Sequence, residues 1–482
     1  METLLLAGCL LWVVGVFVGQ HRNRNFLIAY LLLAGITGTW HVGVNQYRWQ
    51  LVPAYLFLLG ASLVAAIRLG GGPPRPGPRW RAFLARTLLI LALLIVLALP
   101  LWLFPEIRYE RPTGPYGVGT RTEVWVDSSR AETFTPAPDD RRRLLVQIWY
   151  PADPVPGAAR VRSHPSPREL ARGLASAAPG IPSFLFSSLG RGLTWARAEV
   201  PVSGAQRTFP LLLFSHGFGV SRTQYGFAMA ELASHGYVVA GIEHSYAAIG
   251  TVFPDGEVAN VRLEDAKLLQ NDSSANAMAA VWAGDGRFVL ERMFELVRRD
   301  PRQTLTGRID TTRIGYFGHS FGGAAAANVM AADPRVLAGV NLDGYLAGSA
   351  WVNGLDRPFL QVRSDSLDIE AMAEETLKQV GMTRQSLREL LEEWNRRTVS
   401  VTRGGGHELH LKGSSHLNYS DLPLWSPVVS RVSHQAGTID IRRAHRIVNE
   451  IVAAWFDRHL KGNGPTLNEL AGRYPEIEIL SP

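Results

Sequence analysis

The chain has 482 residues, 46% of them hydrophobic, and a formal net charge of +7 from 49 basic and 42 acidic residues. This length supplies material for more than one domain. The positive charge comes almost entirely from arginine, with no basic cluster interleaved with aromatic residues and no zinc-finger spacing, which argues against a nucleic-acid-binding protein. The single cysteine, Cys9, excludes an intrachain disulfide.

Four apolar segments without acidic side chains occupy the first 105 residues. They cover residues 3–19, 26–45, 51–67 and 84–104, and each is near the roughly 17–25 residues that cross a hydrocarbon core. The first could instead be a signal peptide, but Glu2 stands where a basic n-region is expected and the next apolar segment follows closely. We therefore expect residues 1–105 to form a transmembrane domain of four helices.

Arginines between these segments predict the orientation. Arg22 and Arg24 follow the first segment, and Arg48 alone follows the second. Five more flank the gap between the third and fourth: Arg68, Arg75, Arg79, Arg81 and Arg86. The positive-inside rule places the first and third connections in the cytoplasm. We therefore expect an integral protein of the cell (inner) membrane whose remaining chain lies outside the cytoplasm.

The sequence changes character after the fourth apolar segment. Prolines and glycines interrupt residues 106–120, which predicts a juxtamembrane linker. From Leu144 onward, short apolar runs alternate with longer amphipathic stretches, which predicts βαβ units and a mostly parallel sheet with helices on both faces. The expected strands are residues 144–150, 210–214, 237–242, 313–317, 336–343 and 358–362. In open sheets of this class, side chains for chemistry gather where the strands end.

One serine lies in a pattern typical of a catalytic nucleophile. It is the central residue of Gly318-His319-Ser320-Phe321-Gly322, which follows the strand-like residues 313–317 and precedes the small residues 323–327. Glycines beside a serine permit a strained turn that exposes the hydroxyl at a helix N-terminus. This context predicts that Ser320 is a nucleophile, against the alternative of a packing turn of small residues. It also predicts an α/β-hydrolase fold, with residues 121–482 as the catalytic domain.

A serine nucleophile needs a histidine to take its proton and an acid to orient that histidine. In α/β-hydrolases the acid and then the histidine follow the serine in the chain. Asp343 ends one expected strand, and Asp365 lies shortly after the next one. The position of strand ends does not choose between these two aspartates.

Three histidines follow Ser320 in the chain. His416 lies in a loop beyond the strand expected at residues 407–412, where it can reach a site, and we expect it to be the general base. His407 and His410 lie within that strand, and their spacing does not match a helical zinc pair, so we interpret them as strand or surface residues. No metal and no organic cofactor is expected.

Two backbone amides are expected to stabilise the oxyanion of an acyl-transfer intermediate. One is the amide of Phe321, directly after the nucleophile. The other is the amide of Phe218, because His216-Gly217-Phe218-Gly219 follows an earlier strand and its glycines permit close backbone approach; the alternative is a simple glycine turn. His216 and His244 also follow strands, but they precede Ser320 and are expected to be structural. The charged residues 369–397 predict either a lid or, preferably, a pair of solvated helices.

Five segments together match one known family more specifically than the serine turn does. They are Arg111-Pro112-Thr113-Gly114-Pro115-Tyr116, Gln147-Ile148-Trp149-Tyr150-Pro151-Ala152-Asp153, Phe214-Ser215-His216-Gly217, Leu232-Ala233-Ser234-His235-Gly236 and Gly318-His319-Ser320-Phe321-Gly322-Gly323. On these segments, residues 111–421 resemble the plasma and type II platelet-activating-factor acetylhydrolases, the group VII phospholipases A2, and their bacterial relatives.

The resemblance implies a role for each candidate residue. It places the family's nucleophile on Ser320, its base on His416 and its oxyanion amides on Phe218 and Phe321. It also favours Asp343 over Asp365 as the acid. The four apolar segments, in contrast, are not a feature of the familiar animal enzymes.

The expected function is that of a membrane-anchored serine ester hydrolase. We expect it to cleave short or oxidised acyl esters of phospholipids through an acyl-enzyme, because a tethered site meets lipid at high local concentration. One alternative is a general carboxylesterase acting on small or polymeric esters. Another is a non-enzymatic membrane sensor that uses a hydrolase-like domain for binding.

Overall fold

The structure is a computed structural model that describes residues 2–20, 23–44, 48–71, 87, 95–178, 180–261, 272–365, 382–432 and 436–480. The contacts divide the chain into two compact units, Met1–Glu106 and Ile107–Pro482.

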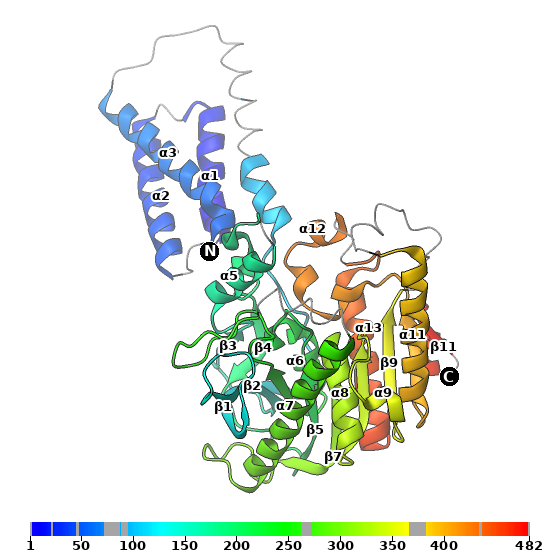
Figure 1. The fold of residues 1–482 in the computed structure, drawn as a ribbon. Helices are drawn as coiled ribbons and strands as arrows, with labels where there is room; N and C mark the ends of the chain where they lie inside the picture. Colours follow the sequence, from blue (N-terminus) through cyan, green and yellow to red (C-terminus); the bar gives the residue numbers. More distant parts are fainter. Residues whose placement is uncertain are drawn as a thin grey trace. The chain divides into compact units, whose positions relative to one another are not determined.

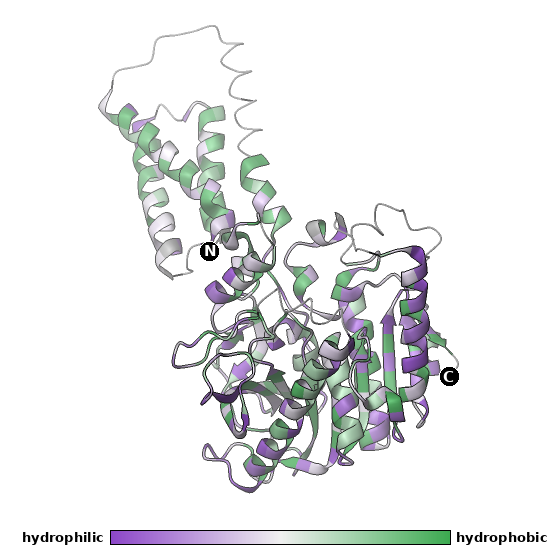
Figure 2. Ribbon diagram, viewed as in Figure 1, coloured by the Kyte–Doolittle hydropathy of each residue, from purple (hydrophilic) through white to green (hydrophobic). Residues whose placement is uncertain are grey.

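The first unit is helical. Its helices are α1 (Glu2–Phe17), α2 (Arg24–Val44), the short 3-10 helix η2 (Trp49–Leu51) and α3 (Val52–Gly70), and residues 95–103 are also helical. Figure 2 shows these helices as largely hydrophobic, and side chains such as Leu5, Tyr30 and Leu58 pack between them. The helices coincide with the first three apolar segments expected from the sequence.

One helix of this unit meets the length and apolarity of a membrane span. Among the described residues, Trp49–Gly70 is long and apolar enough to cross a membrane, whereas Leu4–Phe17 is apolar but shorter. Of the fourth expected span, residues 84–104, residues 84–86 and 88–94 lie outside the described residues. Length and composition alone do not establish a membrane span, so the four-helix transmembrane domain stays a prediction.

The second unit contains an eleven-stranded sheet in the order β11-β10-β9-β8-β7-β5-β6-β2-β1-β4-β3. The strands are β1 (Gly117–Ala131), β2 (Arg141–Ala152), β3 (Arg160–Arg162), β4 (Leu193–Ala198), β5 (Phe209–Ser215), β6 (Val238–Glu243), β7 (Ile309–His319), β8 (Val336–Leu342), β9 (Phe359–Ser364), β10 (His407–Leu411) and β11 (Ile477–Leu480). Six neighbouring strands run parallel to one another: β10, β9, β8, β7, β5 and β6. In contrast, β2 runs antiparallel to both β6 and β1, and β11 runs antiparallel to β10. The predicted α/β class with a mostly parallel sheet is confirmed.

Alternating side chains build a separate core on each face of the sheet. On β5, Leu212 and Phe214 join one cluster, whereas Leu211 and Leu213 join the other. This alternation is the period of two that a strand imposes on its side chains. Figure 1 shows helices packed along the sheet; α6 (Gly226–Ser234) and α13 (Ile441–Phe456) contribute to the first cluster, α7 (Asp272–Arg298) and α8 (Phe321–Ala332) to the second.

The remaining helices lie in the connections. They are α5 (Pro167–Ala177), η3 (Ser183–Ser188), η4 (Arg222–Tyr225), α9 (Ala350–Asn353), α11 (Arg384–Thr402), η6 (His416–Tyr419), η7 (Leu422–Leu424), α12 (Pro427–Val432), η8 (Asp457–Lys461) and α14 (Leu467–Arg473). Within the charged segment expected at residues 369–397, α11 is the described helix, and Figure 2 shows it as largely hydrophilic. Residues 369–381 of that segment lie outside the described residues.

Candidate active site

The three side chains singled out for chemistry follow strands of the parallel part of the sheet. Ser320 and Asp343 come directly after the neighbouring strands β7 and β8. His416 follows β10 after a short turn and begins η6. Because the carboxyl ends of parallel strands share one edge of the sheet, these distant parts of the chain meet there.

The turn at Ser320 requires glycine on both sides. Ser320 adopts φ 55° and ψ −127° between β7 and α8. A β-carbon at Gly318 would lie 2.1 Å from the carbonyl oxygen of Gly322, and one at Gly322 would lie 2.1 Å from that of Ser215. The backbone is therefore too close for any side chain at these two positions, and the strained serine presents its hydroxyl at the N-terminus of α8.

Ser320, His416 and Asp343 form one chain of hydrogen bonds. The Oγ of Ser320 lies 3.0 Å from Nε2 of His416, and Nδ1 of the same ring lies 2.7 Å from Oδ2 of Asp343. Because a carboxylate only accepts, Nδ1 carries the ring proton and Nε2 can accept the proton of the serine hydroxyl. The side chain of His416 is 46% exposed and that of Asp343 is 4% exposed. Solvent therefore reaches the imidazole but hardly the carboxylate.

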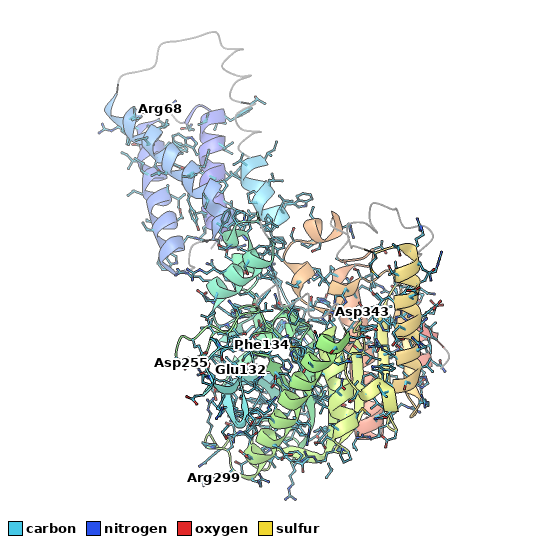
Figure 3. The ribbon with its side chains drawn as sticks, in the orientation of Figure 1. Arg68, Glu132, Phe134, Asp255, Arg299 and Asp343 are labelled. Carbon is cyan, nitrogen blue, oxygen red and sulfur yellow. The ribbon has the colours of Figure 1, made fainter. Side chains whose placement is uncertain are left out.

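The carboxylate of Asp343 is held in place by its neighbours. Figure 3 shows Asp343 at the carboxyl end of the strands, and its backbone adopts φ 56°. Its Oδ1 accepts hydrogen bonds from the backbone N–H of Ser364 at 2.7 Å and from the hydroxyl of Ser364 at 2.9 Å. The other oxygen, Oδ2, is thereby directed at His416.

Asp365 makes a different set of contacts. Its Oδ2 accepts from the N–H of Gly413 at 2.8 Å, and its own N–H donates to the carbonyl oxygen of Ser414 at 3.2 Å. These bonds brace the turn that leads from β10 to His416. Of the two aspartates that strand ends left open, the structure places Asp343 against the imidazole.

The two amides expected to bind an oxyanion belong to segments next to Ser320. Phe321 is the first residue of α8, where backbone N–H groups have no acceptor within the helix. Phe218 follows Gly217, at which an added β-carbon would lie 3.1 Å from the β-carbon of Ser320. A helix N-terminus also favours negative charge. The surroundings of the serine hydroxyl are therefore suited to a developing oxyanion.

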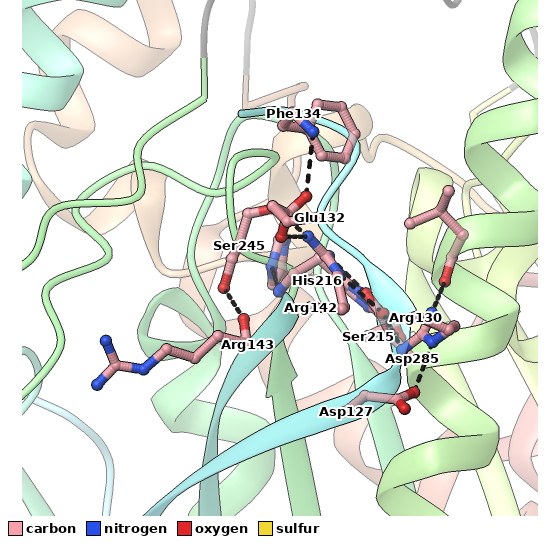
Figure 4. Close-up of polar contacts among 12 residues, drawn as sticks. Asp127, Arg130, Glu132, Phe134, Arg142, Arg143, Ser215, His216, Ser245 and Asp285 are labelled. Atoms are coloured by element: carbon pink, nitrogen blue, oxygen red, sulfur yellow. Dashed lines mark hydrogen bonds and ion pairs between the residues drawn. The ribbon is translucent and has the colours of Figure 1, made fainter. Parts of the chain in front are cut away.

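A buried charge cluster near the loop of Phe218 was not anticipated from the sequence (Figure 4). Arg142 on β2 contacts Asp285 on α7 through two hydrogen bonds of 3.0 and 2.6 Å, and contacts Glu132 at 2.9 Å. Burial alone would raise the pKa of Asp285, but Arg142 and His244 hold that pKa well below its usual value. The sequence offered one signal for this cluster, an aspartate on the buried face of a helix, because a buried charge needs a partner of opposite charge.

The cluster contains a second serine, histidine and aspartate in contact. The Oγ of Ser215 lies 2.8 Å from Nε2 of His244, and Nδ1 of His244 lies 2.8 Å from Oδ2 of Asp285. All three residues are 0% exposed, and burial lowers the pKa of His244 to about 4. No substrate reaches this serine, so the arrangement is structural.

The other expected histidines lie away from Ser320 in the topology. The ring of His407 meets Trp455 edge-on at 6.1 Å, and Nε2 of His410 lies 3.6 Å from Glu408. Within the described ranges, no group of three or more histidine, cysteine, aspartate or glutamate residues is placed to hold a metal ion.

Another buried carboxyl, that of Asp421, lies just beyond the loop that carries His416, which we call the histidine loop. The Oδ2 of Asp421 accepts from the N–H of Gly226 at 2.7 Å and from the hydroxyl of Tyr109 at 3.1 Å. Asp421 is 2% exposed. Its burial outweighs these two bonds and raises the pKa of the carboxyl to about 7.

Comparison with protein families gives this geometry its context. The family described as platelet-activating factor acetylhydrolase, isoform II, matches residues 104–281 and 278–466. The chain belongs to this family. The resemblance predicted from the sequence motifs is therefore confirmed for the second unit, whereas residues 1–103 lie outside the match.

Individual relatives of this acetylhydrolase-family chain are distant in sequence. The platelet-activating factor acetylhydrolase of Cavia porcellus is 25% identical over 389 residues, which cover 74% of this chain and 79% of the relative. That of Canis lupus familiaris is 26% identical over 58% of this chain and 63% of its own. The probable 1-alkyl-2-acetylglycerophosphocholine esterase of Arthroderma benhamiae is 28% identical over 54% of this chain and 65% of its own.

A solved structure is also similar. The ferulic acid esterase from Streptomyces cinnamoneus superposes with a TM-score of 0.61 and 29% identity, over 78% of this chain and all of the esterase. Together with the family, this similarity shows that the chain is a carboxylic ester hydrolase with an esterase-like α/β fold. The alternative of a non-enzymatic membrane sensor is thereby left without support.

Proposed function

We propose that the protein is a serine ester hydrolase resembling the platelet-activating-factor acetylhydrolases, with Ser320 as nucleophile, His416 as general base and Asp343 as the acid. The observation that carries this proposal is the chain of hydrogen bonds of 3.0 and 2.7 Å through the half-exposed ring of His416. Its order, hydroxyl to imidazole to carboxylate, is the one that activates a serine.

The reaction proceeds in two halves. Oγ of Ser320 attacks the ester carbonyl carbon while Nε2 of His416 accepts the hydroxyl proton. The amides of Phe218 and Phe321 donate to the resulting oxyanion. The intermediate collapses by breaking the bond to the alcohol oxygen, and the imidazolium protonates that leaving alcohol. Water, deprotonated by His416, then cleaves the acyl-enzyme and releases the carboxylic acid and the free serine.

The substrate class is acyl esters of phospholipids with short or oxidised chains. Support comes from the family and from the names of two relatives, the platelet-activating factor acetylhydrolase of Cavia porcellus and the probable 1-alkyl-2-acetylglycerophosphocholine esterase of Arthroderma benhamiae. A catalytic unit tethered at a membrane would meet such lipids at high local concentration.

A second candidate is a general carboxylesterase. The ferulic acid esterase favours it, because this chain covers that whole structure at 29% identity. The discriminating measurement is competition between vesicles of short-chain phospholipid and a soluble feruloyl or p-nitrophenyl ester. Preference for the soluble ester at equal ester concentration would select the second candidate.

The nucleophile is tested with a fluorophosphonate probe, which reacts covalently with an activated serine. We expect the full chain to be labelled and Ser320→Ala to remain unlabelled. Ser215→Ala is the matched control, because Ser215 has equivalent histidine and aspartate contacts but is fully buried. That variant should still be labelled. A folded wild-type protein that resists the probe would defeat the proposed function.

The first unit is proposed to anchor the enzyme in the membrane, with the catalytic unit outside the cytoplasm. The apolarity of Trp49–Gly70 supports a span, and the five arginines between residues 68 and 86 support the orientation. A phosphatase reporter is active only outside the cytoplasm, and we expect such a reporter fused after Phe104 to be active. A phosphatase fusion that is silent, beside an active cytoplasmic fluorescent fusion at the same position, would reverse the assigned orientation.

A further inference from the structure

Another chain of hydrogen bonds runs through the protein interior. It connects the loop of residues 216–219, which carries Phe218 and which we call the oxyanion loop, with the histidine loop. The N–H of Gly217 donates to the hydroxyl oxygen of Tyr225 at 3.1 Å, and that hydroxyl lies 2.8 Å from Nδ1 of His319. Nε2 of His319 lies 3.0 Å from the backbone carbonyl oxygen of His416. Tyr225 is 1% exposed and His319 is 2% exposed, so water does not replace these contacts.

The direction of every bond in this chain is determined. The carbonyl oxygen of His416 only accepts, so Nε2 of His319 must carry the proton. Burial, reinforced by the nearby His416, holds the pKa of His319 well below its usual value, so the ring is neutral and Nδ1 is an acceptor. The hydroxyl of Tyr225 therefore donates to Nδ1, and its oxygen is free to accept from Gly217. Bonds aligned in one direction reinforce one another.

The other side of Gly217 is held as well. Nδ1 of His216 donates to the carbonyl oxygen of Gly217 at 2.7 Å, while Nε2 of His216 accepts from the N–H of His244 at 3.1 Å. In a trans peptide, this carbonyl and the N–H of Phe218 point in opposite directions. The clamp on Gly217 therefore sets the direction of the Phe218 amide, which is the proposed oxyanion donor.

We propose that Tyr225 and His319 are positioning residues that hold the oxyanion loop and the histidine loop at a fixed separation. The inference rests on the proposed function, because it assigns the Phe218 amide and His416 to the same reaction. His319 directly precedes the nucleophile in the chain, yet the hydrogen bonds of its ring go to Tyr225 and to the backbone carbonyl of His416. Its ring centroid is 4.6 Å from that of His416.

The test compares two deletions of a buried hydroxyl beside the same histidine. Tyr225→Phe removes the hydroxyl that links Gly217 to His319. Tyr419→Phe is the matched control, since Tyr419 is 0% exposed and its ring lies 5.9 Å from that of His319, but its hydroxyl contacts Ser414 instead. Both variants are assayed with p-nitrophenyl acetate and with a trifluoromethyl ketone, which adds the serine to form a stable oxyanion.

We expect Tyr225→Phe to lower kcat by about 10- to 100-fold, as for a misplaced catalytic group, with KM close to that of the wild type. Its affinity for the trifluoromethyl ketone should fall by the same factor as kcat/KM. Tyr419→Phe should keep both values near those of the wild type. Equal effects of the two substitutions, or a change confined to KM, would overturn the positioning role.

A double-mutant cycle tests whether Tyr225 and His319 act as one unit. His319→Leu removes both bonds of the ring but leaves the bond from Gly217 to Tyr225, so adding Tyr225→Phe should lower kcat by a smaller factor than it does in the wild type. Losses that multiply would mean two independent packing effects and would overturn the inference. If His319→Leu does not fold, His319→Asn keeps an acceptor for Tyr225 and loses the bond to His416, and the tyrosine comparison still decides. Wild-type labelling by the fluorophosphonate separates failure of this inference from failure of the proposed function.

Discussion

Asp343→Asn should lower kcat by about 10⁴-fold, the loss expected when the orienting acid of a serine triad becomes an amide. The physical reason lies in the two hydrogen bonds from Ser364. Its N–H and hydroxyl both donate to the position of Oδ1, so the amide oxygen of the substituted side chain will occupy that position. The amide nitrogen then faces Nδ1 of His416 and donates to it. The ring proton moves to Nε2, which can no longer accept the proton of Ser320.

Asp365→Asn is the matched control for this experiment. Its carboxylate accepts from the N–H of Gly413, so the substitution disturbs one hydrogen bond near the histidine loop. We expect a loss of about tenfold or less, the scale of one neutral hydrogen bond. Steady-state hydrolysis of p-nitrophenyl acetate measures both variants, with circular dichroism as the check of folding. A larger loss in Asp365→Asn than in Asp343→Asn would exchange the roles of the two aspartates.

Asp421→Asn should make the stability of the protein less dependent on pH. An unfolded aspartate loses its proton near pH 4, whereas burial raises the pKa of the folded Asp421 to about 7. Between these values the folded state binds more protons than the unfolded state, so the wild type loses stability as pH rises. The amide has no proton to lose. Relative to the wild type, the variant should therefore gain about 3 kcal/mol between pH 5 and pH 8.

The difference in stability between the wild type and Asp421→Asn separates the effect of the Asp421 carboxyl from that of other titrating groups. Burial lowers the pKa values of His164, His244 and His445 to about 4, and these histidines destabilise both proteins equally as pH falls below 6.5. Asp356→Asn is the control, because its exposed carboxyl has a lowered pKa and stays ionised throughout this range. Denaturant unfolding followed by tryptophan fluorescence provides the measurement. A wild-type-to-variant difference that is the same at pH 5 and pH 8 would contradict the expectation.

Features encoded by local sequence were predictable. The glycines around Ser320 and the apolar runs of β5, β6, β7 and β8 carry their structural meaning within a few residues, so the turn and the parallel strands could be placed from the sequence. His416 could be selected because it follows a strand and comes after the serine in the chain. The resemblance to the acetylhydrolase family added the preference for Asp343.

Features that depend on contacts between distant residues were not predictable. Asp343 and Asp365 both follow strands, and only the folded chain shows which carboxylate meets His416. Arg142 and Asp285 are separated by 143 residues, and no local pattern pairs them. The same limit applies to Tyr225 and His319, which are 94 residues apart. The antiparallel strand β1 was missed because its alternation includes many polar residues.

Ser320 and Asp343 share one backbone property that bears on how this protein can be engineered. Both adopt positive φ, 55° and 56°, a conformation that costs a residue with a β-carbon roughly 1–3 kcal/mol. Glycine would relieve that cost at either position and would remove the side chain on which the proposed chemistry depends. Selection for heat resistance alone would therefore reward loss of the proposed active site, and any thermostabilisation library for this enzyme needs an activity screen at these two positions.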